Sequence, residues 1–508
     1  MRGRAISRIG AALAVTLALA APAAAQSFSI AGVRFDESVY LDEALLKGIA
    51  DRYTNRPVGI ADLQALVDEV NRAYALAGVV TSLAVLPPQE IADGVLHVRL
   101  IEARVEAVDS SALTRTREDF IRDNIRIDEG ATVDFERLEH DLRLFEIAHD
   151  FRPVVSFGPG IGVGMTRAQV GGDEPPRFEH VISADNYGSP QTGKARGAWF
   201  GRWNSVTGRR DILSVQVQKS QGAWSGGVGY SLPAFGQGGR IVASAAHARS
   251  QVISAPFQPV DIRSTSTSAS LGYIRPFRVG PDRHWTFSAD IQFERNESEI
   301  SGLPLLNTDL RDAAIGLAYQ RRFPRAVLAV SLGIRAGSAD TDQTSETEGS
   351  YWLAFGNASY ARRIGDWGLF STAMSYQYAH GQNLPVARLF NAGGATSVRG
   401  YPNAVRSGDS GLIVQNQISS ANGFDIGGGF PVTLSPFAFV DAAVIVPYRV
   451  DGGIDSDQDL LASAGFGVRA EIGERATALL TYGVPLRNTL GFDDRGKGTV
   501  YFGLDMSF

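Results

Sequence analysis

A single arginine stands in an unusually glycine-rich stretch of the C-terminal half of the chain. Residues 390–411 read FNAGGATSVRGYPNAVRSGDSG, and Arg399 follows Gly393 and Gly394 with no partner close by in sequence. A guanidinium group stays charged and offers planar donors that match a carboxylate, so an arginine held away from water needs such an acceptor. An arginine in a solvated loop needs no such acceptor, so the place of this loop in the fold must decide whether Arg399 has a partner.

The sequence lacks the common motifs of nucleotide-binding, nucleophilic and zinc enzymes. Residues 158–164 read GPGIGVG, but the spacing is not G-x-G-x-x-G, and a strand pattern follows where a phosphate-binding helix would be needed. The sequence has no G-x-S-x-G nucleophile turn, and its seven histidines form no H-E-x-x-H zinc motif. We therefore expect that the protein is not an enzyme and uses no cofactor and no metal.

The first 25 residues predict a secretory signal peptide. Arg2, Arg4 and Arg8 precede an apolar run from Ile9 to Ala20, and three alanines at 23–25 suit cleavage. Without these arginines the mature chain is more acidic than the formal net charge of −6 given for the whole sequence. Nucleic acid is thus not an expected partner, because binding it requires a basic face. The absence of cysteine rules out disulfides.

Two small α+β modules are predicted before residue 173. Apolar residues recur at helical spacing from Leu63 to Tyr74, and Gly78 follows as a C-cap. Strand patterns follow this helix, and the same order of elements then repeats. We predict two β-α-α-β-β modules in tandem, at 27–104 and 105–172, with a change of character at the Gly-Gly-Asp-Glu-Pro-Pro sequence that begins at residue 171.

Residues 177–508 predict a different architecture. Segments of about ten residues alternate in polarity and are divided by turn residues, which is typical of a membrane β-barrel. In the last segment, VYFGLDMSF, every second residue from Val500 to Phe508 is apolar. We predict an antiparallel, 16-stranded transmembrane β-barrel, with strands starting near residues 177, 194, 210, 222, 239, 264, 283, 308, 324, 348, 367, 410, 435, 460, 475 and 498.

Loop lengths predict the orientation of this barrel. Connections after even-numbered strands are tight, whereas those after odd-numbered strands are often long, at 251–262, 297–307, 337–349, 381–410 and 447–459. Bacterial barrels have short periplasmic turns and long outer loops, so both ends of the barrel sequence are expected in the periplasm. A soluble β-sandwich or propeller would also alternate in polarity but would not explain this pattern. Charges within strands, such as Arg469 and Glu471, are assigned to the lumen, because a basic residue in lipid costs about 2 to 4 kcal/mol at mid-membrane.

The loop GGATSVRGY resembles the V-R-G-Y or V-R-G-F signature of outer-membrane barrels that carry periplasmic POTRA domains. The signature covers Gly393, Gly394, Val398, Arg399, Gly400 and Tyr401. In that superfamily the loop folds into the lumen, and its arginine pairs with the aspartate of an F-x-D motif on strand thirteen. Phe439 and Asp441, in PFAFVDAAV, match this motif. The resemblance implies that Arg399 contacts Asp441 and that loop 381–410 is folded inward.

Further stretches resemble the two-partner secretion transporters (TpsB), the haemolysin activation/secretion family. They are LPPQEIADGVLHVRLIEARV, FRPVVSFGPGIGVGMTRAQV, DNYGSPQTGKARG and AGFGVRAEI. The resemblance implies that the modules are periplasmic POTRA domains, that the barrel lies in the outer membrane of a Gram-negative bacterium, and that an unfolded TpsA-like exoprotein is captured and exported. In the first of these stretches, Ala103 and Arg104 stand where the family usually has a glycine. The family also usually has a plug helix before the first POTRA domain, but Phe28 already begins the first POTRA-like segment here, so a plug helix is not expected.

Other expected partners are outer-membrane lipids and, during biogenesis, the barrel assembly machinery, for which Phe508 is the expected C-terminal signal. One alternative is a barrel-assembly factor, which shares the V-R-G-Y loop and inserts other outer-membrane proteins, but such factors usually carry three or more POTRA domains. A passive diffusion porin is a second alternative, although it would need neither the modules nor the loop.

Overall fold

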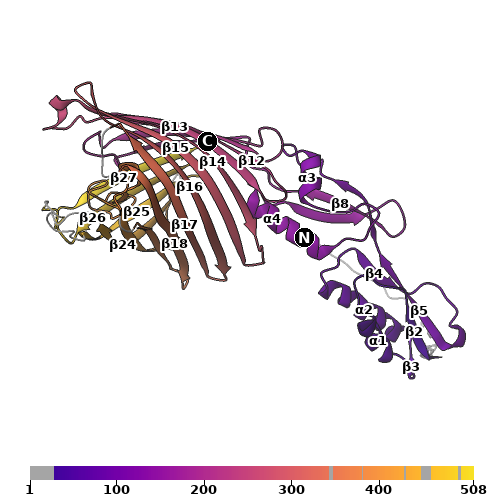
Figure 1. The fold of residues 1–508 in the computed structure, drawn as a ribbon. Coiled ribbons are helices and arrows are strands. Elements are labelled where there is room, and N and C mark those ends of the chain that lie inside the picture. Colours follow the sequence, from indigo (N-terminus) through magenta and orange to yellow (C-terminus); the bar gives the residue numbers. More distant parts are fainter. Residues whose placement is uncertain (1–27, 343–346, 380–381, 428–430, 448–458, 490–492) are drawn as a thin grey trace, which may run out of the picture. The chain divides into compact units, whose positions relative to one another are not determined.

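A computed structural model describes residues 28–342, 347–379, 382–427, 431–447, 459–489 and 493–508 (Figure 1). The expected signal peptide lies outside these residues. The chain divides into two compact units: one holds residues up to 107 with 128–135 and 157–168, and the other holds 108–127, 136–156 and 169–508. The second predicted module, 105–172, thus contributes segments to both units.

The first module has the predicted order of elements. Its helices are α1 (Glu43–Asp51) and α2 (Ile60–Leu76), and its main strands are β2 (Gly32–Phe35), β4 (Ser82–Val85) and β5 (Val95–Glu102). The sheet order is β2-β5-β4, while the short strands β1 (Phe28–Ser29) and β3 (Pro57–Val58) pair separately. Leu66, Val70 and Tyr74 on one face of α2 are buried, as the helical spacing predicts. A 3-10 turn, η1 (Ala92–Gly94), precedes β5.

Residues 104–171 repeat this order. They form β6 (Arg104–Asp109), α3 (Glu118–Asn124), α4 (Phe135–Ala148), β7 (Val154–Pro159) and β8 (Met165–Gly171), with the sheet order β6-β8-β7. Phe120, Ile121, Leu138, Leu144 and Phe145 are the buried apolar residues of the two helices. Among all described helices, none is long and apolar enough to cross a membrane.

The rest of the described chain forms a closed antiparallel barrel. Its sixteen strands are β9 (Phe178–Asp185), β10 (Arg196–Asn204), β11 (Ile212–Ser220), β12 (Ala223–Pro233), β13 (Arg240–Gln251), β14 (Ile262–Phe277), β15 (Arg283–Ile300), β16 (Leu303–Phe323), β17 (Ala326–Thr341), β18 (Gly349–Ile364), β19 (Gly368–Tyr378), β22 (Ser410–Ser420), β24 (Val432–Val446), β25 (Asp459–Ile472), β26 (Ala476–Pro485) and β27 (Thr499–Ser507). A short strand, β23 (Phe424–Ile426), continues β22 along β24. The predicted number of strands is confirmed.

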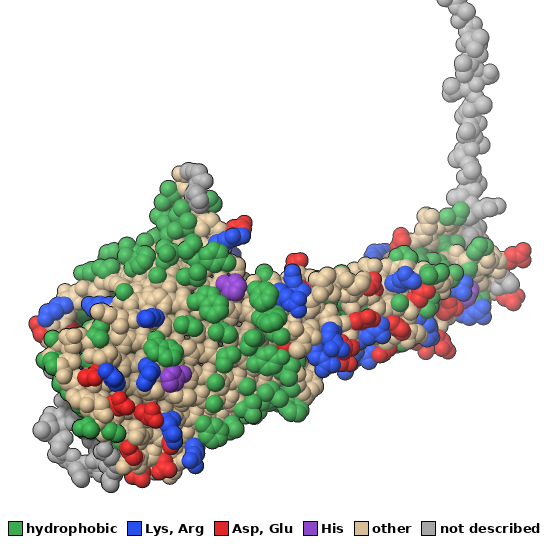
Figure 2. All heavy atoms as spheres, turned by 90° about the horizontal axis from the view of Figure 1, so that it is seen from above, with side chains coloured by type: hydrophobic (Ala, Val, Ile, Leu, Met, Phe, Trp, Pro, Cys, Tyr) green, Lys and Arg blue, Asp and Glu red, His purple; other side chains and the backbone are tan. Residues whose placement is uncertain are grey.

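The barrel wall is apolar outside. On β27, Val500, Phe502 and Met506 are exposed, whereas Tyr501 between them is buried on the inner face. Figure 2 shows hydrophobic side chains spread over the outer face of the barrel, with charged side chains gathered toward one end. Alternation along each strand thus separates a face suited to lipid from an inner polar face.

Two predicted outer loops are much shorter in the structure. The loop expected at 297–307 is a turn at 301–302 between β15 and β16, with a register shift at Ser298 and Glu299. The loop expected at 337–349 is strand up to Thr341. These prolonged strand ends carry polar residues such as Glu297 and Asp340, so they lack the apolar alternation by which a strand in lipid is recognised.

The barrel closes through a short seam. β27 pairs with β9 only from Gly503 opposite Asp185 to Ser507 opposite Val181, whereas the neighbouring pair β9 and β10 runs from Phe178 to Asp185. Phe508 follows directly after β27, and its backbone exchanges hydrogen bonds of 2.9 and 3.2 Å with His180. The last residue of the chain therefore extends the seam, and its side chain is exposed.

Candidate functional site: a loop held inside the barrel

The segment between β19 and β22 folds into the barrel. It contains η3 (Val386–Arg388) and a small hairpin of β20 (Phe390–Ala392) and β21 (Arg406–Gly408). Ala392, Val398 and Tyr401 of this loop are fully buried and pack with inner-wall residues of β22, β24 and β25. Gly393 and Gly394 lie between the hairpin and the tip with φ of +108° and +101°, a conformation that side chains rarely adopt.

Arg399 contacts Asp441 on β24, the pairing that the resemblance implies. The Nε and Nη2 groups of Arg399 donate to the two carboxylate oxygens at 2.7 and 2.8 Å, and the backbone N–H of Arg399 adds a bond of 3.1 Å. Nη1 donates to Gln417 on β22 at 2.8 Å. The Asp441 side chain has no exposed surface, and that of Arg399 retains 11%. Since water is excluded, each charge depends on the other.

Phe439, two residues before Asp441, supports the same guanidinium. The Cζ atom of Arg399 lies 3.6 Å from the centre of the Phe439 ring, which is the geometry of a cation–π contact. The same ring lies against Gly465 on β25, where a Cβ atom would lie 2.5 Å from Cζ of the ring. Gly465 belongs to the AGFGVRAEI stretch, so the glycine in that stretch leaves room for the ring.

Gly400 and Tyr401 fix the loop to the last strands. The N–H of Gly400 donates to the Tyr501 hydroxyl at 3.0 Å, and that hydroxyl donates to the Tyr401 carbonyl at 2.8 Å. The Tyr401 hydroxyl donates to the carbonyl of Arg487 at 2.8 Å and lies 3.0 Å from that of Ala462. The tip of the loop therefore touches β24, β25 and β27, all on one side of the barrel.

A second anchor, which the sequence did not predict, lies at the start of the loop. Arg388 of η3 donates to Glu294 on β15 at 2.8 Å and to Asp312 on β16 at 2.9 Å. The Tyr351 hydroxyl donates to Asp312 at 2.6 Å, and Arg335 on β17 lies against the same carboxylate. The side chains of Arg388 and Asp312 are 10% and 0% exposed. No local motif marks Arg388, and its partners lie far away in sequence.

The charges assigned to the lumen do line an inner space. Arg469 and Glu471 border a cavity of about 500 Å³ together with Arg399, Tyr501 and Ala395 of the loop. Polar groups of the wall and the loop thus face one another. Among the residues that the structure describes, no group of three or more His, Cys, Asp or Glu side chains is placed to hold a metal ion.

In the first module, motif residues stabilise loops. The Gln89 side chain accepts from the His97 N–H at 2.8 Å and donates to the His97 carbonyl at 2.6 Å, as a strand neighbour would. Glu102 accepts from the Val39 N–H at 2.9 Å and from the Tyr74 hydroxyl at 2.9 Å. The Glu102 contacts tie the chain between β2 and α1 to β5 and α2, whereas the Gln89 contacts tie the segment before β5 to that strand.

A groove follows one edge of the first sheet. Strand β2 pairs with β5 alone among the described strands, so its other edge has free backbone groups. This edge and α1 line a groove of about 770 Å³, with Leu46 and Ala50 among its apolar residues and Lys47 and Asp51 among its charged ones. An open strand edge beside an apolar helix face can accept an added strand.

The barrel turn between β10 and β11 is attached to residues around α4. Arg210 in this turn has no exposed side-chain surface and donates to Asp150 at 2.7 Å, and it lies 3.4 Å from Glu174. Beside it, Arg240 contacts Nδ1 of His149 at 3.1 Å. Burial, together with the charges of Arg240 and Arg210, lowers the pKa of His149 to about 3. His149 is therefore neutral and accepts the hydrogen bond from Arg240.

Two family models match the chain. Residues 164–470 match the family described as haemolysin secretion/activation protein ShlB/FhaC/HecB, and residues 28–103 match the POTRA domain of ShlB type. The first match covers more than half of the chain and includes every residue of the loop and both of its anchors.

Known proteins are similar over different spans. The haemolysin transporter protein ShlB of Serratia marcescens is 21% identical over 474 residues, which is 89% of this chain and 82% of that protein. The haem/hemopexin transporter protein HuxB of Haemophilus influenzae strain 86-028NP is 26% identical over 196 residues, and the match spans about a third (34%) of its length. The solved structure of CdiB from Escherichia coli covers 98% of this chain and 94% of its own, with a TM-score of 0.70 and 19% identity, and so shares the fold.

Proposed function

Because this chain belongs to the haemolysin secretion/activation family, we propose that it is an outer-membrane transporter of two-partner secretion, which exports an unfolded exoprotein from the periplasm through its barrel. The observation that carries the proposal is the inward loop, held between two charged anchors in a barrel that follows POTRA-like modules. A passive porin has no need for an arginine sealed against a buried carboxylate.

The first module captures the client in this proposal. The open edge of β2 offers main-chain donors and acceptors, and an extended segment can pair with them whatever its side chains are. The groove beside α1 gives room for every second side chain of that segment. Capture of this kind suits an unfolded exoprotein of the TpsA type, and it holds the client at the periplasmic side of the barrel.

The loop positions the transport path. Arg399 and Asp441 form a bidentate pair that a lysine could not reproduce, since its ammonium group is a point charge. Breaking a buried pair by removing one partner costs about 3 to 5 kcal/mol, enough to fix one loop position. Gly393, Gly394, Val398, Gly400, Tyr401 and Phe439 shape this position. Lipids cover the outer apolar face, and the barrel assembly machinery recognises Phe508 during insertion.

The alternative function is assembly of other outer-membrane barrels. The short seam between β27 and β9 favours it, since such a seam is the easiest place to open the wall. The two modules before the barrel favour secretion, because barrel-assembly factors usually carry more POTRA domains.

Deleting the gene and comparing surface and released proteins separates the two functions. Loss of one large exoprotein, restored when the gene is supplied again, is expected for the transporter. A general fall in outer-membrane barrels with no specific exoprotein lost would replace the proposal with the assembly function. The deletion also identifies the client for further experiments.

A further inference from the structure

One sector of the inner wall carries no charge. The inward residues of β11 to β14 can be read from the strand register, since residues paired across strands point to the same face. Ser244 pairs with Ser270, which pairs with Gln292, and Gln292 pairs with Asp312, whose carboxylate meets the loop inside the barrel. Ser244 and Ser270 therefore face the lumen, and their hydroxyl oxygens are 2.7 Å apart.

The same alternation applies along these strands. The structure describes all residues from Ile212 to Gly272. In this range, the inward positions of β11 to β14 that lie between Arg240 and the outer loops hold no Asp, Glu, Lys or Arg. Most are serine, glycine, alanine or glutamine. We call this surface the neutral wall; its hydroxyl and amide groups come mainly from Ser214, Gln216, Gln218, Ser225, Ser244, Ser250, Ser264, Ser266, Ser268 and Ser270.

The loop occupies the other sectors. Its start is fixed by Arg388 to Glu294 and Asp312 on β15 and β16, and its tip is fixed by Arg399 to Asp441 on β24. No residue of β11 to β14 pairs with Arg388 or Arg399; the nearest link is a bond of 3.5 Å from the Ser266 hydroxyl on β14 to Glu294. The two anchors together hold the loop away from the neutral wall.

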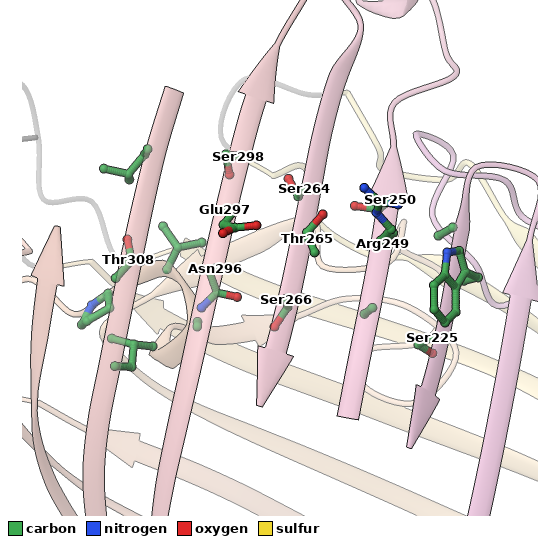
Figure 3. Close-up of a pocket in the computed structure, with 18 of the residues that line it drawn as sticks. Ser225, Arg249, Ser250, Ser264, Thr265, Ser266, Asn296, Glu297, Ser298 and Thr308 are labelled. Atoms are coloured by element: carbon green, nitrogen blue, oxygen red, sulfur yellow. The ribbon is translucent and has the colours of Figure 1, made fainter. Parts of the chain in front are cut away.

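An open space remains between the neutral wall and the loop. A cavity of about 380 Å³ is bordered by Ser225, Ser264 and Ser266 on one side and by Pro385 and Val386 of the loop on another. Figure 3 shows the side chains that line this space from neighbouring strands, with Ser225, Ser264 and Ser266 on the neutral wall, Thr308 on β16, and the charged Arg249 and Glu297 among them. Arg249 and Glu297 also border this space, but the register places them at outward positions, so the inward polar side chains that face the loop here are hydroxyls and amides.

We propose that the neutral wall is the surface along which the exported chain passes, as an extended and unfolded polypeptide. The inference rests on the proposed secretion function and names the path that this function uses. The recognised chemistry is the peptide backbone itself, because a serine hydroxyl can both donate and accept and so serves N–H and C=O groups alike.

The absence of charge favours movement. A charge on this wall would attract the opposite charges of a passing chain and hold the chain in place, most strongly where the chain displaces water from the wall. Passage requires contacts that are weak and repeated along the path. Small side chains also leave width for those of the client. The wall that holds the loop has the opposite character, with tight and specific ion pairs.

Thiol labelling in planar bilayers tests where the open path lies without any client. The protein has no cysteine, so each variant carries a single thiol. Ser268→Cys and Ser244→Cys are placed on the neutral wall, Thr267→Cys is its outward neighbour, and Ser371→Cys lies on the other side of the lumen, where Ser371 borders the cavity at Arg399. A negatively charged methanethiosulfonate should lower the ion current of the first two variants strongly, leave Thr267→Cys unchanged and affect Ser371→Cys less. An equal or greater loss at Ser371→Cys overturns the inference.

Charge insertion tests the same wall during export. With the client identified by gene deletion, Ser268→Asp should lower its surface level several-fold, whereas Ser371→Asp should lower it little and Ser268→Thr should leave it unchanged. Normal export by Ser268→Asp contradicts the neutral-wall path while leaving the secretion function intact. Absence of a client for the unaltered protein rejects the secretion function, and the bilayer result then still locates the open space.

Discussion

The backbones of Gly400 in the loop and Gly483 on β26 touch each other. A Cβ atom on Gly400 would lie 2.9 Å from the Gly483 carbonyl carbon, and a Cβ atom on Gly483 would lie 2.8 Å from the Gly400 nitrogen. Neither distance is compatible with a side chain. The arginine beside Gly400 reaches Asp441 only because the loop backbone can come this close to the wall.

Gly483→Ala should displace the loop tip without straining its own backbone. Gly483 has no positive φ, so the added methyl group acts through its collision alone. We expect lower export and a higher bilayer conductance, with the barrel still inserted. Gly197→Ala on β10 is the matched control, because a Cβ atom there meets nothing within 4 Å. Equal behaviour of the two variants would show that the close contact does not position the loop.

Arg399→Ala should leave a folded barrel and impair export. The variant leaves Asp441 buried without its partner. This should destabilise the inward position of the loop by about 3 to 5 kcal/mol. Arg399→Lys should recover only part of the export, because it loses the bidentate bonds and the planar stack on Phe439. Heat-modifiable migration on gels reports the folded barrel, and surface immunoblots report the client. Full secretion by Arg399→Ala would remove this pair from transport.

Arg388→Ala tests the second anchor. Removing this arginine leaves Glu294 and Asp312 without their loop partner, so the start of the loop should detach while Arg399 stays on Asp441. We expect frequent current fluctuations in bilayers at nearly normal mean conductance. The double variant Arg388→Ala with Arg399→Ala should give a lasting rise in conductance. If Arg388→Ala alone matched the double variant, the two anchors would not be independent.

Because of His149, we predict that acid weakens the attachment of the turn around Arg210 to the residues around α4. Its folded pKa of about 3 lies below the ordinary value of about 6.5. Since the unfolded segment binds a proton more readily, the stabilisation is fully present above about pH 6.5 and is lost progressively as the pH falls toward 3. Hydrogen exchange of α4 should therefore rise at pH 5 relative to His149→Gln, which does not titrate. Identical pH profiles would contradict this assignment.

Deleting residues 28–103, the segment matched by the POTRA model, tests capture in the groove. The barrel keeps its own hydrogen-bonded wall, so conductance should persist, whereas export should be abolished because the edge of β2 is lost. Bilayer recordings and surface immunoblots measure the two effects separately. A client that still reaches the surface at normal levels would show that this module does not capture it.

Alternation and turn residues predicted the barrel well, because each strand must place apolar residues toward lipid. The start of β24 was predicted near 435 and lies at Val432, and the largest difference is at β16, predicted near 308 and starting at Leu303. Lengths were less predictable. Beyond the apolar part of the wall, pairing continues through residues such as Glu297 and Asp340, and no lipid contact constrains their polarity.

Long-range contacts separate what was predictable at the site from what was not. Arg399 and Asp441 were found through a shared signature, whereas Arg388 lies in no such motif, and its partners Asp312 and Glu294 precede it by 76 and 94 residues. Arg210 was missed for the same reason, since its carboxylates come from two separate segments. Such contacts form only when segments distant in sequence come together in the fold. The alternation of polar and apolar residues along one strand carries no information about them.

Strand length differs strongly around the barrel. β16 has 21 residues and β10 has 9, and at about 3.4 Å per residue the difference amounts to roughly 40 Å along the strand. The hydrogen-bonded wall is therefore longest at β14 to β18 and short at β9 to β11. We therefore expect an emerging segment to leave the wall sooner on the flank of β9 to β11 than beside β16, so that an exported protein begins to fold on that flank.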